Sequence, residues 1–506
     1  MLEFSLFRRQ YLLGPRSAVI PGWRAVPFGA SSILCTHPEL PVAEIRGEDR
    51  ELICVGDMFS PLQPQADNHS VLQSLFDQFT DFEKIEQASS AIGGRWMLLA
   101  RRGIEMRAYP DATASRPIYH CSRDGDTWVA SLPSLLAGKL ALVAEPASDG
   151  TPMPGPSSGW WSGALTPYRE IRQSLPNHYL DLVNRVSTRF WPRQQIAPLD
   201  VETAASEINR LLLGIITAAS SRYELYVALT GGYDSRLLAA ISTPLHHKIR
   251  FFTLDYPGIV DCDLAIPSRL AKGLGLRYTR EVFEPAPEDF VRDFDTVASG
   301  IAGGQCVLNA YSYARFPNQA VFVEGTASEV LRCYFYKDEP HPATIDAAAL
   351  AKKSRLEGNP IAEAEIGRWL QGVPRGMGVS ILDLYFWEQE EGGRNAGDFT
   401  TQELTRFVFS PFSCRRLLEV GLGSATNVRQ RPHLLHRTAC RLACPQVLEE
   451  PFNVAPNDIV KAATVRHTDG KGNPEVNQRT RPTELAKDQT TTRNAISSTC
   501  ERSYKN

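Results

Sequence analysis

Short apolar stretches separated by turn residues fill the first 195 positions of the chain. Four of them are SAVIPGWRAVPFG, ELICVGDMF, GRWMLLARRGIEMRAYPD and PIYHCSRDGDTWVASL. Each is rich in Val, Ile, Trp or Tyr and lies near Gly, Asp or Pro, which is typical of strands joined in hairpins. We therefore predict that this part of the chain is built mainly from strands.

A different pattern begins at residue 200. Residues 200–221 carry apolar side chains at helical spacing, and Asp200 is a suitable N-cap. The apolar run LYVALTGG (225–232) predicts a strand that ends in glycines, and RLLAAIS continues it as a helix. KIRFFTLDY (248–256) and AIPSRLAKGLGL (265–276) repeat the order of strand and helix. This alternation predicts a parallel sheet with right-handed crossovers.

Two segments lack either pattern. Residues 144–163 are rich in Pro, Gly and Ser, as in an exposed loop. From about Pro456 the chain is polar and nearly free of aromatic residues, which favours disorder. We therefore divide the chain into domains 1–195 and 200–455 and a tail, 456–506.

Charge and composition narrow the possible partners and compartment. The chain has 54 basic and 57 acidic residues, a formal net charge of −3, so no electrostatic argument favours nucleic acid or an anionic membrane. The N-terminal residues do not follow the pattern of a signal peptide, and no apolar run is long enough for a transmembrane helix. The 10 cysteines form no disulfide framework. We expect a cytoplasmic protein without nucleic-acid or membrane partners.

The candidate chemistry lies in VALTGGYDSRLLAA, residues 227–240. Gly231 and Gly232 allow a sharp turn and close approach of a ligand, and the following helix offers free N–H groups to an anion. Thr230 and Ser235 add hydroxyl groups, and the Asp234 carboxylate suits Mg²⁺ beside phosphate oxygens. No Lys follows the glycines, so this is not a GxxxxGK[ST] loop. The alternative is a plain strand-to-helix turn capped by Asp234.

TGGYDS (230–235) resembles the SGGxDS pyrophosphate loop of the ATP pyrophosphatases, and the closest resemblance is to the asparagine synthetase family. Weaker resemblances follow in the family's order. In the C-terminal part they are FFTLDY (251–256) with Asp261 and Asp263, LAKGLGLRY (270–278), VEGTASEVLRCYFY (323–336), and the segments 384–397, 409–420 and 433–453. GRWMLLARRG (94–103), DATASRPIYH (111–120) and WVASLPSLL (128–136) resemble the family's glutaminase domain.

The resemblance implies an α+β and α/β fold. An N-terminal glutaminase-like (Ntn-type) β-sandwich would be followed by a C-terminal adenine nucleotide α-hydrolase-like (PP-loop) parallel sheet. It also implies an ATP-dependent, amide-forming ligase: ATP and a carboxylate give an acyl-adenylate and pyrophosphate, and an amine then displaces AMP. The implied cofactors are ATP and Mg²⁺. The residues implied for pyrophosphate and Mg²⁺ are Thr230, Gly231, Gly232, Asp234 and Ser235; those near adenine are Leu229 and Leu254; and Glu329 has an amine-side or Mg²⁺ role.

The sequence departs from the family at several functional positions. Leu2 stands where the family has its nucleophilic Cys, and Val55 replaces an Asn that serves the oxyanion, so we expect no glutamine hydrolysis. The Asp of the family's GEGADE element is also replaced, because Ala327 and Ser328 precede Glu329, and one expected Mg²⁺ ligand is thereby lost. A Lys expected after EEPFNV is missing, and Lys461 or Arg415 are the candidates to replace it.

Four functions remain open at this point. The first is an asparagine synthetase-type ligase that joins a small-molecule or peptide carboxylate to an amine or to ammonia, supplied free or by a separate glutaminase. The second is a peptide cyclase similar to the lasso-peptide enzymes, and the third is a tRNA-modifying enzyme, which the neutral charge disfavours. The fourth is a nucleotide-binding protein without catalysis. A homodimer is compatible with each of them. The His433 and His436 pair is more typical of surface or core histidines than of a metal site.

Overall fold

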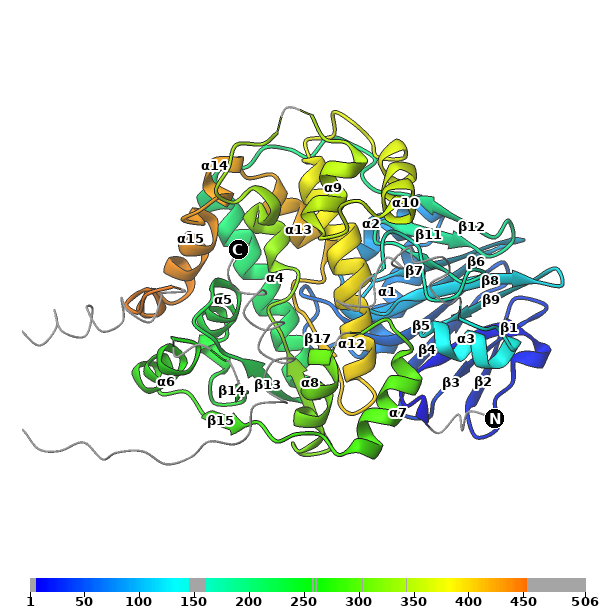
Figure 1. Ribbon diagram of the computed structural model, residues 1–506, viewed down its shortest axis with the longest axis horizontal. Coiled ribbons are helices and arrows are strands. Elements are labelled where there is room, and N and C mark those ends of the chain that lie inside the picture. Colours follow the sequence, from blue (N-terminus) through cyan, green and yellow to red (C-terminus); the bar gives the residue numbers. More distant parts are fainter. Residues whose placement is uncertain are drawn as a thin grey trace, which may run out of the picture.

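The computed structural model describes residues 6–144, 161–256, 259, 262–302, 304–342 and 344–452. The predicted disordered tail, most of the 144–163 loop, Leu2, Asp261 and Lys461 lie outside these residues. Within them, an antiparallel β-sandwich and a parallel sheet wrapped by helices lie side by side (Figure 1). The mixed architecture expected from the sequence is therefore confirmed, while the domain boundaries stay a prediction.

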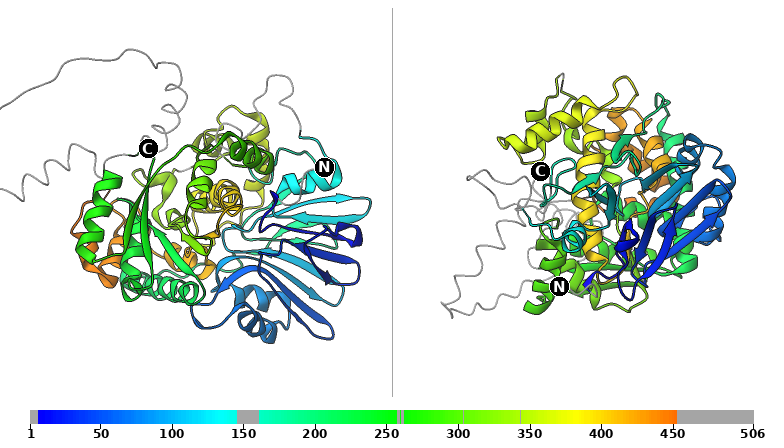
Figure 2. Two further views of the ribbon diagram at one scale, coloured as in Figure 1. Left: turned by 90° about the horizontal axis from the view of Figure 1, so that it is seen from below. Right: turned by 90° about the vertical axis from the view of Figure 1, so that its right-hand side faces the viewer.

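Two antiparallel sheets, each with six strands among the described residues, form the sandwich (Figure 2). The first sheet has the order β10 (Arg172–Ser174), β8 (Ile118–Arg123), β9 (Asp126–Ala130), β1 (Tyr11–Pro15), β3 (Ser32–Thr36), β2 (Arg24–Phe28). The second has the order β12 (Val186–Arg189), β11 (His178–Asp181), β7 (Glu105–Pro110), β6 (Gly93–Arg102), β5 (Arg50–Phe59), β4 (Val42–Arg46).

The strand β5 shows why the sequence pattern here is nearly continuous rather than alternating. Its residues Ile53 and Val55 pack between the two sheets against Leu13 of β1. Leu52 and Cys54 point the other way, into a core shared with helices. Because successive side chains of a strand face opposite sides and both sides are covered here, apolar residues occupy every position.

The parallel sheet has the order β15 (Tyr278–Val282), β14 (Arg250–Asp255), β13 (Glu224–Ala228), β16 (Ala320–Val323), β17 (Val408–Phe409), with every pair parallel. The chain leaves β13 through α5 (Tyr233–Ile241) to β14 on one side, and later returns to β16 on the other. The strand order therefore reverses beside β13. In parallel sheets, ligands bind outside the carboxyl ends of the strands at such a reversal.

Helices cover both faces of this sheet. One face packs on α4 (Val201–Arg222) and α5 through apolar residues of β13, β14 and β16. The other packs on α8 (Gly304–Ala314) and α12 (Ala396–Gln402) through aromatic side chains such as Phe322 and Tyr313, whose rings stack at 3.8 Å. The sequence predicted α4, and Asp200 caps it by accepting a hydrogen bond from the Thr203 N–H (2.9 Å).

The remaining helices surround these layers. They are η2 (Arg16–Ala18), α1 (Asn68–Gln78), α2 (Phe82–Ser89), α3 (Pro133–Leu140), η4 (Thr243–Leu245), α6 (Cys262–Leu274), α7 (Glu288–Ala298), η5 (Ser328–Arg332), η6 (Tyr334–Tyr336), α9 (Ala347–Lys353), α10 (Pro360–Gln371), α11 (Ile381–Tyr385), the π-helix η7 (Phe386–Asn395), α13 (Arg415–Leu422), α14 (Thr426–Arg429), α15 (Leu434–Ala443) and η8 (Pro445–Leu448). None of the helices in the described residues is long and apolar enough to span a bilayer.

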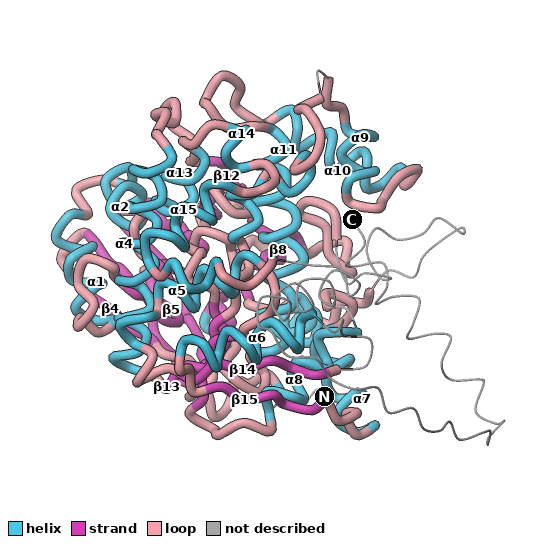
Figure 3. Tube along the Cα trace, turned by 90° about the vertical axis from the view of Figure 1, so that its left-hand side faces the viewer, coloured by secondary structure: helices cyan, strands magenta, loops and turns pink. Residues whose placement is uncertain are grey.

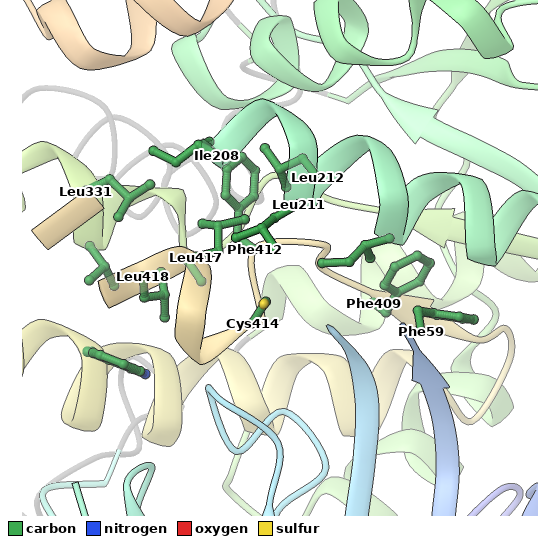
Figure 4. Close-up of a cluster of buried hydrophobic side chains, with 14 of the residues drawn as sticks. Phe59, Ile208, Leu211, Leu212, Leu331, Phe409, Phe412, Cys414, Leu417 and Leu418 are labelled. Carbon is green, nitrogen blue, oxygen red and sulfur yellow. The ribbon is translucent and has the colours of Figure 1, made fainter. Parts of the chain in front are cut away.

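One hydrophobic core joins the sandwich to the parallel sheet. Phe59 at the end of β5 packs on Phe409 of β17, with ring centroids 4.9 Å apart, and Leu211 and Leu212 of α4 lie in the same cluster (Figure 4). Cys414, a candidate reduced thiol, is buried among them. The two halves of the chain therefore pack as one body through buried apolar surface.

Candidate functional site

The sequence TGGYDS spans the turn after β13 and the first three residues of α5, at the carboxyl edge of the parallel sheet; Figure 3 shows β13 and α5. The Ser235 hydroxyl accepts a hydrogen bond from the Thr230 N–H (3.0 Å), and the two hydroxyl groups lie 3.0 Å apart. Thr230 Oγ1 also accepts the Gly232 N–H (3.1 Å). Thr230 and Ser235 therefore hold the turn in shape from both ends, with Gly232 as the N-cap of α5.

The Gly231 N–H points at a carboxylate. It donates a 2.9 Å hydrogen bond to Oδ1 of Asp263, at the start of α6. Burial raises the pKa of Asp263, although the Gly231 hydrogen bond opposes this. A backbone N–H at a helix N-terminus that holds a carboxylate has the chemistry for a phosphate oxygen. For this N–H to bind phosphate, Asp263 would have to give up the contact.

The residues predicted to lie near adenine flank this turn. Leu229 is buried, with its N–H bonded to the Phe252 carbonyl (2.8 Å) and its own carbonyl accepting from Thr253 Oγ1 (2.6 Å). Leu254 is partly buried at the end of the neighbouring strand β14. Leu229 therefore lies on β13 against β14, whereas contact with adenine stays a prediction.

The segment after β16 packs directly on the start of α5. A Cβ added to Gly325 would lie 2.7 Å from the Cβ of Asp234, so only glycine allows this approach. Just before it, Glu324 accepts hydrogen bonds from the Tyr313 hydroxyl (2.6 Å) and Thr326 Oγ1 (3.5 Å). Burial, together with the charge of Asp398, raises the pKa of Glu324 to about 7.

Glu324 was not among the residues singled out from the sequence, which favoured Glu329 in the same segment. The signal that marks it is a Glu directly after the buried strand AVFV, whose neighbour β13 carries the loop. Because parallel strands end at one edge, this position brings Glu324 to the edge that carries the loop.

A charged cluster surrounds Asp234. Its Oδ2 accepts a 2.6 Å hydrogen bond from Nη2 of Arg332, which also lies 3.5 Å from Oε1 of Glu329. Its Oδ1 lies 3.7 Å from Nε2 of His436, and the same nitrogen is 2.7 Å from the Ser328 hydroxyl. The structure therefore brings the predicted Asp234 and Glu329 together through Arg332, and adds His436 from α15.

Burial sets the charge state of this cluster. It raises the pKa of Glu329 to about 7, with the charge of Asp234 acting in the same direction and Arg332 opposing. It lowers the pKa of His436 well below its ordinary value, and Arg332 and His433 add to the effect, so the imidazole is neutral. Burial alone would lower the pKa of Arg332, but the charges of Asp234 and Glu329 outweigh it.

The π-helix η7 contributes more acidic groups near Glu329. Burial, followed by the charge of Glu329, raises the pKa of Glu391 well above its ordinary value. Burial also raises the pKa of Glu390, against the effect of Arg394, which lies 3.9 Å away. π-Helical segments occur frequently at functional sites. The segment WEQEEGGRN resembled the family in sequence, but its acidic residues were not predicted as site residues.

Residues 447–452 pack against the turn between β13 and α5. The Arg236 guanidinium donates to the carbonyls of Gly231 (3.0 Å), Val447 (3.3 Å) and Pro451 (2.7 Å). The rings of Tyr233 and Phe452 stack at 4.2 Å, and the His433 ring meets Tyr233 edge-on at 4.7 Å. These hydrogen bonds and ring contacts hold residues 447–452 against the loop and α5.

One expectation about the missing Lys is wrong. Arg415, offered as its replacement, is buried in the interface with the sandwich, where Nε donates to Asn177 (3.1 Å) and the guanidinium lies over the Phe190 ring. The cation that pairs with the Asp234 carboxylate is Arg332. The sequence did not reveal this, because Arg332 is distant from the loop along the chain.

The residues around Asp234 are compatible with Mg²⁺ but do not form a ready-made site. Asp234 Oδ1 and Glu329 Oε2 are buried oxygens without a hydrogen-bond partner among the described residues. Carboxylate oxygens are the ligands that Mg²⁺ prefers. Within the described ranges, however, no three His, Cys, Asp or Glu side chains are grouped to hold a metal. A metal here would take further oxygens from phosphate and water.

Two residues of β5, Val55 and Asp57, lie in different environments within the sandwich. Val55 is buried in the sandwich core between Val42 and Met97. Nearby, Asp57 accepts a 2.8 Å hydrogen bond from the Tyr223 hydroxyl and lies within 4.0 Å of Arg9. Val55 offers no side-chain donor to an oxyanion, and the absence of glutamine hydrolysis stays a prediction.

No family model matches the sequence, and no curated protein matches it. Solved structures resemble the chain only at a low level, and two of them serve as examples. One is glutamine phosphoribosylpyrophosphate amidotransferase from B. subtilis in complex with ADP and GMP (TM-score 0.24, 9% identity, covering 63% of this chain and 76% of that chain). The other is described as the allosteric regulatory enzyme of purine biosynthesis (TM-score 0.24, 10% identity, covering 72% of this chain and 73% of that chain). Neither assigns a family or a function to this chain.

Proposed function

We propose that the protein is an ATP-dependent ligase that adenylates a carboxylate, releases pyrophosphate and forms an amide with ammonia or an amine. One observation carries the proposal: the glycine turn after β13 and the acidic segment after β16 meet where the strand order of the parallel sheet reverses. A turn that can bind an anion suits the phosphates of a nucleotide. Carboxyl groups of raised pKa suit the second reactant, an amine that must lose a proton when it attacks.

In the first step, an oxygen of the substrate carboxylate attacks the α-phosphorus of ATP, and the bond to pyrophosphate breaks. The turn around Gly231 and Gly232, with the hydroxyl groups of Thr230 and Ser235, would hold the phosphates in line for this attack. Mg²⁺ beside Asp234 would supply charge stabilisation to the phosphate oxygens. The protein contributes mainly position and preorganised dipoles.

In the second step, the amine attacks the activated carbonyl carbon, AMP leaves, and the nitrogen loses a proton. Glu324 is suited to take that proton, because a carboxyl group with a pKa of about 7 is half ionised near neutral pH. Val55 stands where the resembled family has an Asn that serves the oxyanion, so the proposal includes no glutamine hydrolysis by this chain. The acyl substrate is either a small molecule or a peptide.

The test is pyrophosphate release from Mg-ATP. The full chain would be given aspartate with ammonium, then glutamine in place of ammonium, then a panel of carboxylates and a cell extract. Pyrophosphate and AMP released together support the ligase, and asparagine formed with ammonium alone identifies the substrate. ATP bound without any release would favour a nucleotide-binding protein without catalysis, for which the pairing of Asp234 with Arg332 is the supporting observation.

Asp234→Asn provides the first mutational prediction. Loss of the loop carboxylate should reduce pyrophosphate release by about 100-fold or more, because phosphate positioning and charge both depend on it. Asp200→Asn is the matched control: it removes a carboxylate at the start of α4, and Asn caps a helix equally well. Full activity in the Asp234 variant would refute the assignment of the loop.

A further inference from the structure

The segment after β16 inserts a buried arginine into the loop region. Arg332 ends the short helix η5, and its side chain is 13% exposed. Nη2 donates to Asp234 Oδ2 (2.6 Å) and lies 3.5 Å from Glu329 Oε1. Nε is buried and has no partner among the described residues. The guanidinium is therefore held beside the N-terminus of α5, and its Nε–H group is not paired with a protein acceptor among the described residues.

Arg332 is the cation that pairs with the carboxylate of the loop, Asp234. His436, with a side chain only 1% exposed, is neutral, and its Nδ1 has no hydrogen-bond partner among the described residues. Both Nη groups of Arg236 donate to backbone carbonyls of the turn and of residues 447–451, and its Nε, like that of Arg332, has no partner among the described residues. Arg332 differs from Arg236 in its ion pair with Asp234, which holds its guanidinium beside the first turn of α5.

Guanidinium geometry suits that ligand. Its planar fork matches two oxygens of a phosphate group and forms strong, charge-assisted hydrogen bonds. A pair of carboxylates, Asp234 and Glu329, fixes its position while its buried Nε keeps no hydrogen-bond partner among the described residues. Stabilisation of this kind is most useful on the pyrophosphate, which gains negative charge as its bond to the α-phosphorus breaks.

We propose that Arg332 is the phosphate-binding cation of this site, contacting the β- and γ-phosphates of ATP and the pyrophosphate that leaves. The inference rests on the proposed function and adds a residue to it. Arg332 supplies in this chain the positive charge for which no lysine was found near the loop. The opposing interpretation is that Arg332 only neutralises the two carboxylates.

The two interpretations predict different effects of one substitution on the affinity for pyrophosphate. The probe is inorganic pyrophosphate, titrated calorimetrically onto the full chain with and without Mg²⁺. If Arg332 binds phosphate, Arg332→Gln weakens binding about 10- to 100-fold under both conditions, as expected for the loss of charge-assisted hydrogen bonds. If it only neutralises charge, the variant frees two carboxylates for Mg²⁺, and pyrophosphate binding with Mg²⁺ stays equal or becomes tighter. That second result would overturn the proposal.

Two further variants control the experiment. Arg250→Gln removes an arginine that pairs with Glu224 (2.6 Å) at the opposite, amino end of the same sheet, and should leave binding unchanged. Arg332→Lys keeps the positive charge near Asp234 but loses the fork, so it should fold and bind pyrophosphate with intermediate affinity. If Arg332→Gln does not fold, wild-type affinity in Arg332→Lys overturns the proposal.

The outcome for the wild-type chain separates this inference from the function on which it rests. Wild-type release of pyrophosphate from Mg-ATP, with the same rate and affinity in Arg332→Gln, would overturn only the role of Arg332. A wild-type chain that binds neither ATP nor pyrophosphate would overturn the proposed function and this inference with it.

Discussion

At the scale of single residues, burial rather than residue type decides the chemistry. Glu324 and Glu329 are glutamates like many others in the chain, but burial is the main cause that raises the pKa of each to about 7. His436, an obvious titratable candidate in the sequence, is neutral because its pKa is lowered by the same cause. A sequence reveals the carboxyl groups but not which of them are removed from water.

Glu324→Gln is the prediction that belongs to this scale. We expect kcat to rise as pH passes through about 7 in the wild-type protein, and the variant to lose this rise along with about 10²- to 10⁴-fold in kcat. Glu329→Gln should keep the pH dependence. A flat profile in Glu329→Gln with a normal rise in Glu324→Gln would assign the proton acceptor to Glu329 instead.

Stability against pH provides the fold control for that variant. A carboxyl group with a raised folded-state pKa stabilises the fold below the unfolded pKa of about 4.3, and this contribution is lost as pH rises through about 7. Gln resembles the protonated form. The melting temperature of Glu324→Gln should therefore match the wild type at acid pH and exceed it at pH well above 7.

At the scale of elements, the site depends on two loops that approach because their strands are neighbours. The turn after β13 carries Asp234, and the segment after β16 carries Gly325 in van der Waals contact with it. The sequence identified both segments separately. Their contact follows from the strand order, in which β16 returns beside β13 from the far side of the chain.

Gly325→Ala tests this contact. The added Cβ would lie 2.7 Å from Asp234 Cβ, so the segment after β16 must move away from α5. We expect a loss of about 1–3 kcal/mol in the free energy of unfolding and a fall in pyrophosphate release. The comparison is Gly273→Ala, inside α6 with no atom within 4 Å of the new Cβ, which should be neutral or slightly stabilising. Equal behaviour of the two variants in urea titrations would argue against the contact.

At the scale of the whole molecule, a buried ion cluster joins the sandwich to the helical part. Glu403, at the end of α12, accepts hydrogen bonds from Arg9 (3.0 Å), Arg95 (2.6 Å) and Arg116 (2.8 Å), and its side chain is fully buried. Burial alone would raise the pKa of Glu403, but the three arginines hold it at about 2. The sandwich thus contributes to the stability of the part that carries the candidate site.

Glu403→Gln should destabilise the protein by about 3–5 kcal/mol, because it leaves buried guanidinium groups without their counter-charge. Since the folded-state pKa of Glu403 is lowered, its contribution is present above about pH 4.3 and lost as pH falls through about 2. The difference in stability between wild type and variant should therefore shrink with acid. Hydrogen exchange should rise in both β6 and α12. The control is Glu207→Gln, which removes a carboxylate from a more exposed ion pair with Arg210. If both variants lost a similar, small amount of stability, the buried cluster would not couple the two halves of the molecule.

Local patterns in the sequence determined the elements that depend on neighbours along the chain. The helical spacing after Asp200, the glycine turn of TGGYDS and the strand-helix alternation were all readable, and they were confirmed as α4, the β13–α5 turn and the parallel sheet. The predicted strand 225–232 is shorter in the structure, because β13 ends at Ala228 and the turn begins there. These features depend on backbone geometry and on the periodicity of apolar residues, and both can be recognised in a short stretch of sequence.

The tertiary structure alone decided which distant side chains meet. Arg332 rather than Arg415 contacts Asp234, Asp263 occupies the Gly231 N–H, and Glu403 pairs with three arginines of the sandwich. Each contact joins residues far apart in sequence, and its strength depends on removal from water. The residue types determine the charges and the hydrogen-bonding groups, whereas tertiary packing determines which groups are buried and which distant residues pair. The sequence was therefore sufficient to identify the loop, and only the fold showed which side chains contact it.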